Sequence, residues 1–233
     1  MNAPLKWAII TTGLPLSYQS SVDGWHGLLD GTRITNPTRV TSLFWRDSEG
    51  RTRTERSVFT PSPFHTEQPK IDLVEIRDPI AGVQYVFNTR DLIAYRYPFT
   101  AAEPPPQTPP VTSVPVKPPS SPNPDQPTTT TESLGSTVIE GITVDGTRRI
   151  TVFPTGWMGN NRPITKVCDT WHSAELNINV LYQCSEPPNS ESAFRLTDIS
   201  RGEPDPSLFQ LPPEYSIVDG PDRITMTFHP SAQ

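Results

Sequence analysis

The sequence predicts an all-β protein, built mainly from antiparallel strands that follow one another as a meander. Helical periodicity, with apolar residues recurring at every third or fourth position, is nearly absent from the 233 residues. Short runs rich in β-branched and aromatic residues alternate instead with turn signals. Because these turns are short, strands that are consecutive in the sequence should be antiparallel neighbours.

The strands of the first half are predicted from five such runs. Gly50 suits a left-handed turn position and the Asp47 carboxylate can hydrogen-bond the local backbone, which favours a tight turn between the first two runs. Pro79 and Gly82 mark a second turn. The runs are RVTSLFW (39–45), RTRTERSVF (51–59), IDLVEIR (71–77), VQYVF (83–87) and LIAYRY (92–97).

Residues 98–131 cannot form the interior of a sheet, because proline lacks a backbone donor and few apolar residues are available for burial. The chain contains 29 prolines, and residues 98–127 hold twelve of them. We predict a flexible Pro/Thr-rich linker of extended, polyproline-II character. A plain spacer is the first interpretation, and a ligand for proline-binding modules is the second.

The strands of the second half are predicted from six runs. Asp145 and Gly146 form a two-residue hairpin signal between the first two of them. The runs are STVIEGITV (136–144), TRRITVF (147–153), ITKVCDTW (164–171), NINVLYQC (177–184), AFRLTDI (193–199) and, as the last strand, RITMTF (223–228).

The stretch GEPDPSLFQLPPEY (202–215) carries two acids, Glu203 and Asp205, but no histidine or second acid is tied to them by spacing. Asp205 can instead cap a short helical turn, with Pro206 at the first helical position, where its missing N–H costs nothing. Phe209 would then cover one end of the sheet. The stretch is therefore interpreted as a structural clasp rather than a catalytic loop.

These elements divide the chain into an N-terminal segment of uncertain order (1–22), a first β half (23–97), the linker (98–131) and a second β half (132–230). Each half offers few strands, and a small open sheet buries little area and leaves its edges unpaired. We therefore expect the two halves to complete one shared sheet, since a long insert costs little loop-closure entropy. Two separate β lobes are the alternative.

The net charge of −6 argues against a general nucleic-acid binder. Six arginines nevertheless fall between residues 33 and 56, and the hairpin that carries Arg51, Arg53 and Arg56 is a candidate surface for an anionic partner. Solvated faces or internal ion pairs are the simpler explanation. No run approaches 18 apolar residues, so no membrane span is expected, and the N-terminus is a poor signal peptide.

The two cysteines are predicted to form a disulfide. If residues 173–177 are the turn between two antiparallel strands, Cys168 and Cys184 lie directly opposite each other, within reach of a disulfide. Two buried free thiols are the alternative for a protein that stays in the cytosol.

Motifs for catalysis, metals and cofactors are missing from the sequence. No two histidines have the spacing of a metal-ligand pair. No nucleophile elbow, P-loop or dinucleotide-binding glycine motif occurs. We therefore expect no enzyme, metal or cofactor, although a hydrolase site assembled in space stays open as a third hypothesis.

Aromatic residues in and beside the strands suggest a second role besides core packing. A curved sheet with one apolar face can hold a lipid or another hydrophobic ligand. The loop TGWMGNNRP (155–163) presents two large apolar residues and could cover such a site. The candidate ligand-binding residues are Trp157, Met158, Trp45, Tyr85 and Trp171.

Two sets of segments carry a family resemblance. DGTRIT, SLFWRDSEGRTRTE and IRDPIAGVQYVFN in the first half, and ESLGSTVIEGITVDGTRRI, RPITKVCDTWHSAELNINVLYQCSEP and FRLTDISRGEPDPSLFQLPPEY in the second, resemble bacterial envelope proteins common in Acidobacteria. These in turn are distantly similar to the LolA/LolB-like and RseB-like superfamily.

The resemblance implies a curved, half-open barrel of antiparallel strands that cups a lipid or acyl chain. It also implies a periplasmic or secreted protein without catalytic activity. A structural or protein-interaction module of the cell envelope, with no small-molecule ligand, is the alternative.

Overall fold

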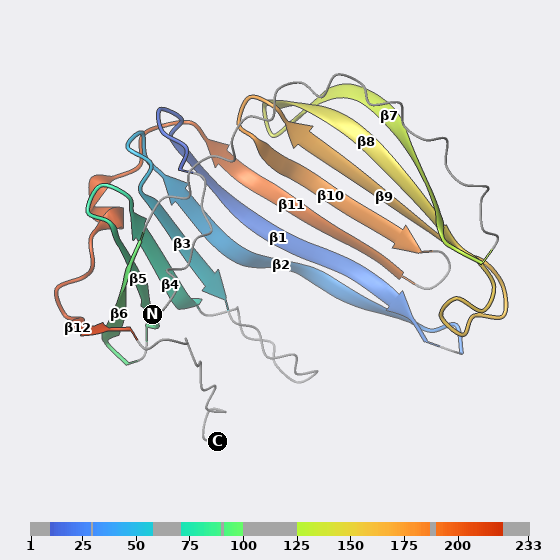
Figure 1. The fold of residues 1–233 in the computed structure, drawn as a ribbon, viewed down its shortest axis with the longest axis horizontal. Helices are drawn as coiled ribbons and strands as arrows, with labels where there is room; N and C mark the ends of the chain where they lie inside the picture. Colours follow the sequence, from blue (N-terminus) through green and yellow to red (C-terminus); the bar gives the residue numbers. More distant parts are fainter. Residues whose placement is uncertain are drawn as a thin grey trace. The chain divides into compact units, whose positions relative to one another are not determined.

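The structure is a computed structural model, and it describes residues 10–28, 30–57, 71–89, 91–99, 125–186 and 190–220. In these residues it contains twelve β-strands and one short 3-10 helix, η1 (Figure 1). The elements are β1 (Leu16–Gly27), β2 (Arg33–Arg46), β3 (Thr52–Ser57), β4 (Ile71–Asp78), β5 (Val83–Phe87), β6 (Ile93–Pro98), β7 (Thr128–Ile139), β8 (Ile142–Phe153), β9 (Ile164–Ser173), β10 (Ile178–Glu186), β11 (Ser190–Ser200), η1 (Pro206–Phe209) and β12 (Ser216–Asp219).

All twelve strands are hydrogen-bonded into one sheet with the order β12-β6-β5-β4-β3-β2-β1-β11-β10-β9-β8-β7. Neighbours from β3 to β6 and from β7 to β11 run antiparallel, and β12 pairs parallel with β6. Among the described strands the order ends on β12 and β7, which are not paired with each other, so this sheet is open. The predicted all-β class and antiparallel meander are therefore confirmed.

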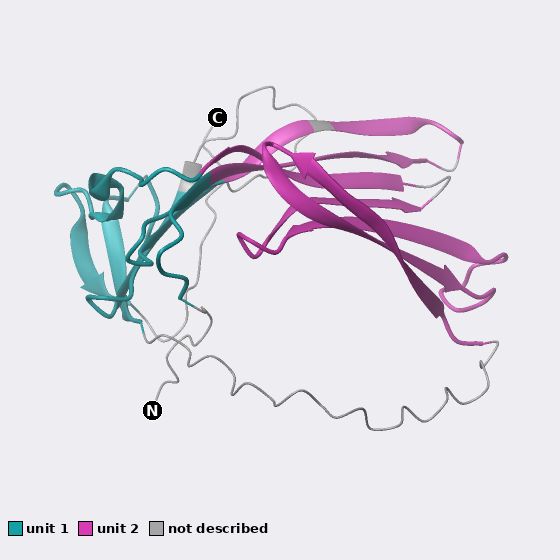
Figure 2. Cartoon of the chain, turned by 90° about the horizontal axis from the view of Figure 1, so that it is seen from above, with its two compact units in different colours: residues 1–17, 43–104, 201–233 teal, residues 18–42, 105–200 magenta. Residues whose placement is uncertain are grey.

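The chain divides into two compact units (Figure 2). Unit 1 comprises residues 1–17, 43–104 and 201–233, and its described elements are β3 to β6, η1 and β12, with the adjoining ends of β1 and β2. Unit 2 comprises residues 18–42 and 105–200, and it holds most of β1 and β2 together with β7 to β11.

The core of unit 1 lies on one face of β4, β5 and β6. The strand register places Val74 opposite Phe87 and Ile76 opposite Tyr85, so their side chains share that face. Val74, Ile76 and Phe87 are buried with Ala94. The segment after η1 covers them: Tyr215 packs its ring edge-on against Phe87, with the ring centroids 4.7 Å apart.

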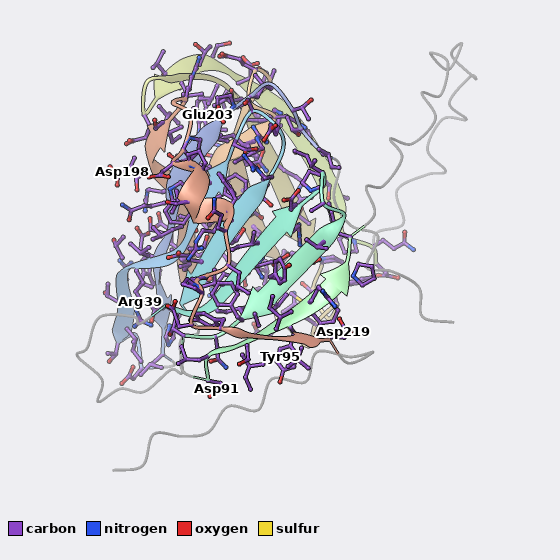
Figure 3. All side chains as sticks on the ribbon, turned by 90° about the vertical axis from the view of Figure 1, so that its left-hand side faces the viewer. Arg39, Asp91, Tyr95, Asp198, Glu203 and Asp219 are labelled. Atoms are coloured by element: carbon purple, nitrogen blue, oxygen red, sulfur yellow. A yellow bond between two sulfur atoms is a disulfide. The ribbon has the colours of Figure 1, made fainter. Side chains whose placement is uncertain are left out.

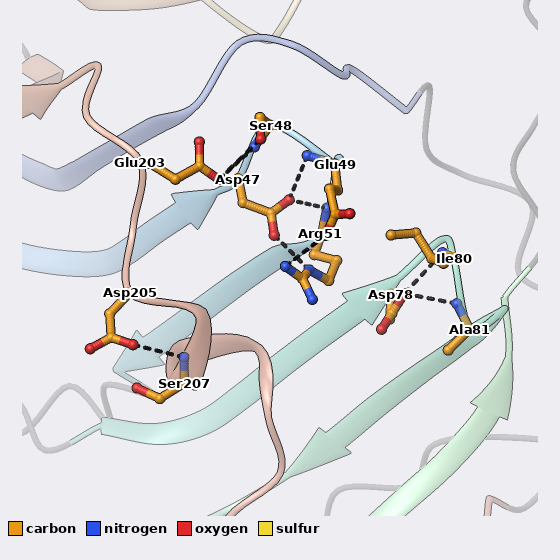
Figure 4. A network of polar contacts seen from close by, with 10 residues as sticks. All are labelled: Asp47, Ser48, Glu49, Arg51, Asp78, Ile80, Ala81, Glu203, Asp205 and Ser207. Atoms are coloured by element: carbon orange, nitrogen blue, oxygen red, sulfur yellow. Dashed lines mark hydrogen bonds and ion pairs between the residues drawn. The ribbon is translucent and has the colours of Figure 1, made fainter.

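The predicted turn between β2 and β3 is confirmed (Figure 4). Asp47 is buried, with its side chain 2% exposed, and its Oδ1 accepts backbone hydrogen bonds from Glu49 (3.1 Å) and Arg51 (2.8 Å). Gly50 has φ +86°, which a residue without Cβ adopts at little cost. Arg51 donates from Nε to Asp47 Oδ2, and this hydrogen bond is the main reason that the pKa of Arg51 is raised.

The predicted Asp145–Gly146 hairpin is wrong, because both residues lie inside β8. The turn is formed instead by Glu140 and Gly141, whose φ values of 51° and 73° are those of a two-residue hairpin turn. Gly146 is in the strand because the Trp171 ring of β9 packs against it: a Cβ at Gly146 would lie 2.6 Å from that ring. The glycine therefore permits a close approach rather than a turn.

The predicted clasp around η1 is confirmed. The Asp205 side chain caps η1 by accepting a hydrogen bond from the Ser207 backbone N–H, and Pro206 is the first residue of η1. Phe209 is 6% exposed. Arg53 donates from Nη1 to the Leu208 carbonyl (3.0 Å), which ties η1 to β3.

Several predicted boundaries differ from the observed ones. Strand β1 begins at Leu16, ahead of the predicted boundary at residue 22. Strand β7 begins at Thr128, so the four threonines assigned to the linker pair with residues 149–152 of β8, as their β-branched side chains favour. Residues 100–124 of the linker and the predicted strand 223–228 lie outside the described residues.

Candidate functional site

The predicted ligand-binding residues belong to different units. Trp45 and Tyr85 are in unit 1, where Trp45 is half-buried at the end of β2 and Tyr85 packs against the core cluster of β4 to β6. Trp157, Met158 and Trp171 are in unit 2. The five residues therefore do not form one described site, and the assignment of Trp45 and Tyr85 to a ligand stays a prediction.

The sheet of unit 2 has two different faces. Strand registers place Ile150 opposite Val167, Val152 opposite Thr165 and Leu181 opposite Trp171, so these side chains share one face. We call this the apolar face and define it by Ile150, Val152, Val167, Trp171 and Leu181.

The other face, which we call the polar face, is largely hydrophilic on β8, β9 and β10. It carries Thr147, Arg149, Lys166, Thr170 and Tyr182, and its apolar residues Phe153 and Ile164 lie beside the β8–β9 loop.

The five residues that define the apolar face are half-buried. Every described element of unit 2 is a strand of the one sheet, so no described helix or second sheet forms a layer over this face. An apolar sheet face is normally buried against a second layer. The described part of unit 2 therefore presents apolar surface that another molecule or segment can cover.

One end of the apolar face is closed by its own side chains. Ile142 and Val144 of β8 are buried there, together with Leu176 and Val180 at the β9–β10 turn. The Trp171 ring lies next to this cluster, against Gly146. Trp171 thus separates the buried end of the face from the half-buried part.

Charged residues interrupt the apolar face between Trp171 and Val167. Arg148 of β8 donates from Nε to Asp169 Oδ1 (2.7 Å) and from Nη2 to Asp169 Oδ2 (2.8 Å). Glu132 of β7 lies 3.9 Å from Arg148 Nη1. Planar two-bond pairing of this kind is the strongest geometry for an arginine and a carboxylate, so the pair is fixed and its charges compensate each other.

A second set of interacting polar side chains lies on β10, β11 and β1. Gln183 Nε2 donates to Glu191 Oε1 (3.0 Å), and Trp25 Nε1 donates to Glu191 Oε2 (3.2 Å). The Arg33 guanidinium lies 4.1 Å from the centroid of the Trp25 ring, and Arg195 is paired with Asp23. Each of these charged side chains thus has a partner within this part of unit 2.

The loop between β8 and β9 exposes Trp157 (51%) and Met158 (57%). Asn160 shapes it by donating from Nδ2 to the carbonyls of Pro154 (2.8 Å) and Arg162 (2.7 Å) and by accepting from the Met158 backbone N–H at Oδ1 (3.0 Å). The loop is therefore ordered by its own hydrogen bonds while its two largest apolar side chains face solvent. A role for them in covering a ligand stays a prediction.

The three arginines of the predicted partner surface differ in their surroundings. Arg51 binds Asp47 and Glu49, and Arg53 binds Glu55 and the Leu208 carbonyl, all within unit 1. Only Arg56 of the three has a mostly exposed side chain (54%), with Glu75 at 3.9 Å. A protein partner at these arginines stays a prediction.

The predicted disulfide is confirmed. Cys168 and Cys184 are directly opposite each other in β9 and β10 and are bonded. They lie on the polar face, on the same side as Thr170 and Tyr182. The register on either side of the cysteines is regular, from Trp171 opposite Leu181 to Val167 opposite Ser185, as a short turn between the two strands requires.

Within the described ranges, no three His, Cys, Asp or Glu side chains gather in a way that could hold a metal ion. The same ranges contain no helix that is long and apolar enough to cross a membrane.

The Arg148–Asp169 pair was not predicted from the sequence. The cysteine register places Asp169 opposite Gln183 on β10, but the partner on β8 depends on the conformation of the intervening loop. Ten residues separate β8 from β9, and their number alone does not determine which residues of the two strands are opposite.

Comparisons with known proteins identify no sequence family. No protein-family model matches the chain, and no curated protein sequence matches it significantly. Two similar solved structures are the lipoprotein LppX from Mycobacterium tuberculosis (11% identity, TM-score 0.29, covering 80% of this chain and 87% of that one) and a LolA superfamily protein from Nitrosomonas europaea (8% identity, TM-score 0.29, covering 87% and 93%).

The second of these structures belongs to the superfamily that the sequence resemblance names.

Proposed function

We propose that this protein binds a hydrophobic ligand, a lipid or an acyl chain, on the apolar face of unit 2 and catalyses no reaction on it. The observation that supports the proposal is the half-buried apolar face in a unit whose described elements form a single layer. Covering such a face is favourable by about 25 cal/mol for each Å² of apolar surface removed from water.

The ligand would lie along the half-buried part of the face, over Ile150, Val152 and Val167, with Trp171 at its inner limit. Trp157 and Met158 are exposed in the loop that follows β8, where they would contact the ligand or its exposed end. An acyl chain suits this surface because it is flexible and needs no hydrogen-bonding partner.

We further propose that the protein acts in the bacterial envelope, in the periplasm or after secretion. The Cys168–Cys184 disulfide supports this location, because disulfides persist in oxidising compartments and are rare in the cytosol.

The proposal is tested by measuring uptake of a fluorescent fatty acid and by native mass spectrometry of gently purified protein. Val167→Asp places a charge on the apolar face and should abolish uptake. Thr170→Asp is the matched control, because Thr170 is also half-buried on β9 but lies on the polar face. Equal uptake by both variants, or no uptake and no co-purified lipid in the unmodified protein, would refute the proposed function.

A further inference from the structure

The two edge strands of the sheet are protected very differently. At one edge, β12 is only four residues long and pairs with β6. It is held by hydrogen bonds from the Ser216 N–H to the Leu92 carbonyl (2.9 Å) and from the Gly220 N–H to the Arg96 carbonyl (2.8 Å), and by an ion pair between Arg96 and Asp219 (2.7 Å). Figure 3 labels Asp219 at one end of β12. Short edge strands with charged side chains are a common protection against pairing with other chains.

The other edge, β7, carries little such protection. It is twelve residues long and exposed along nearly its whole length, and its other side has no partner among the described strands. Its sequence, TTTTESLGSTVI, contains five threonines, no proline and no basic residue. Glu132 is its only charge, and a bulge between Ser133 and Gly135 is its only irregularity. A long exposed edge of β-favouring residues is a template for another strand.

We propose that β7 pairs antiparallel with β7 of a second copy of this chain, through the regular segment from Thr128 to Ser133. The segment is suited to itself because four of its six residues are threonine, so threonine lies opposite threonine at the axis, and Thr–Thr pairs are favourable across strands. The structure already contains such a contact on the inner side of β7, where Thr129 Oγ1 lies 3.3 Å from Thr151 Oγ1 of β8.

The single charge of β7 selects among the possible registers. A twofold axis between two antiparallel edge strands is perpendicular to the sheet, so it passes midway between one residue and the same residue of the other copy, which are directly opposite each other. An axis at Thr130 places Thr128 opposite Glu132, and an axis at Thr131 places Thr130 opposite Glu132. An axis at Glu132 would place two carboxylates directly opposite each other, which is unfavourable. An axis at Thr128, Thr129 or Ser133 would pair three residues of the segment or fewer, whereas an axis at Thr130 or Thr131 pairs five, so the dimer is centred on Thr130 or Thr131.

The symmetry has a structural consequence. Because the axis is perpendicular to the sheet, the apolar faces of the two copies lie on the same side of the joined sheet. The apolar face of one unit 2 would continue into that of its partner, separated by β7 of each copy. Pairing itself depends only on the edge, so it does not require a ligand.

Cross-linking of single cysteines tests the contact. Both native cysteines are in the disulfide, so one added cysteine is the reactive thiol. Thr130→Cys or Thr131→Cys should form a disulfide-linked dimer under mild oxidation, because residues at the axis bring their Cα atoms within about 4.5–5.5 Å of each other. Thr143→Cys is the control, since Thr143 is exposed but lies on β8. No dimer with either β7 variant, or an equal yield with the control, would overturn the proposal.

Sedimentation velocity over a range of concentrations tests the association itself. A short edge contact predicts a dissociation constant of roughly 1–100 µM. The double variant Thr129→Lys/Thr131→Lys should raise the dissociation constant about tenfold, because lysines then lie opposite lysines across the axis and repel each other. Thr143→Lys/Thr147→Lys adds the same charge on β8 and should leave it unchanged. The proposal would be overturned if the unmodified protein were a monomer at every concentration, or if both double variants had the same dissociation constant. Circular dichroism verifies that each variant is folded.

Discussion

Replacing Phe209 by alanine tests how much the clasp around η1 contributes to unit 1. The Phe209 side chain is 6% exposed, and the Arg51 guanidinium lies 5.5 Å from the centroid of its ring. Removing a buried phenylalanine costs about 3–5 kcal/mol from lost burial and the cavity that remains. The contact with Arg51 adds at most about 1 kcal/mol at a partly exposed site. Because η1 is short and lies at the surface, the gap can partly close, and we expect about 3 kcal/mol.

Urea unfolding followed by far-ultraviolet circular dichroism measures this loss as a shift of the unfolding midpoint. Leu208→Ala is the matched control, since Leu208 is the preceding residue of η1 and is only half-buried. Leu208→Ala should lower the free energy of unfolding clearly less than Phe209→Ala does. An unchanged midpoint for Phe209→Ala, or equal shifts for both variants, would show that η1 does not hold unit 1 together.

Three further changes test other parts of the fold. Gly146→Ala should lower the free energy of unfolding by about 1–3 kcal/mol, because the added Cβ would lie 2.6 Å from the Trp171 ring. Urea unfolding measures this change in the unmodified protein and in a Trp171→Ala background, and an equal loss of stability in the two would contradict the reasoning. Replacing Cys168 and Cys184 together by alanine should lower the free energy of unfolding by about 3 kcal/mol, given their separation of 16 residues, and an unchanged thermal midpoint would refute that expectation. The pKa of Asp205 is lowered, mainly by the hydrogen bond from the Ser207 backbone, so its stabilising contribution is present above the pKa of the unfolded chain and is lost as the pH falls through the lower folded value. The stability difference between the unmodified protein and Asp205→Ala should accordingly shrink on acidification, and a difference independent of pH would argue against the cap.

Much of the fold follows from local signals in the sequence. Asp47 and Gly50 identify the β2–β3 turn because one supplies a side-chain acceptor and the other a left-handed backbone, and both act within a few residues. The cap of η1 is local in the same way. The cysteine pairing could be derived because its hairpin turn is short.

The errors arise where a distant side chain decides the structure. Gly146 follows an aspartate as hairpin glycines often do, but the ring of Trp171 determines that it lies in a strand. The placement of β1 between β2 and β11 joins segments that are far apart in the sequence, so no turn signal indicates it. The composition of the apolar face depends on the β8–β9 register, which the sequence leaves open.

The Arg148–Asp169 pair gives the last test, which rests on the proposed function. The pair lies between Trp171 and Val167 on the apolar face, so an acyl chain that passed over it would remove two hydrogen-bonded charges from water. Replacing both with apolar residues, as Arg148→Met/Asp169→Leu, should therefore increase the affinity for a fluorescent fatty acid. Arg148→Met alone leaves the Asp169 carboxylate without its partner and should decrease it. If both variants bind like the unmodified protein, the chain does not cross this pair and the ligand is confined to the surface between Val167 and the β8–β9 loop.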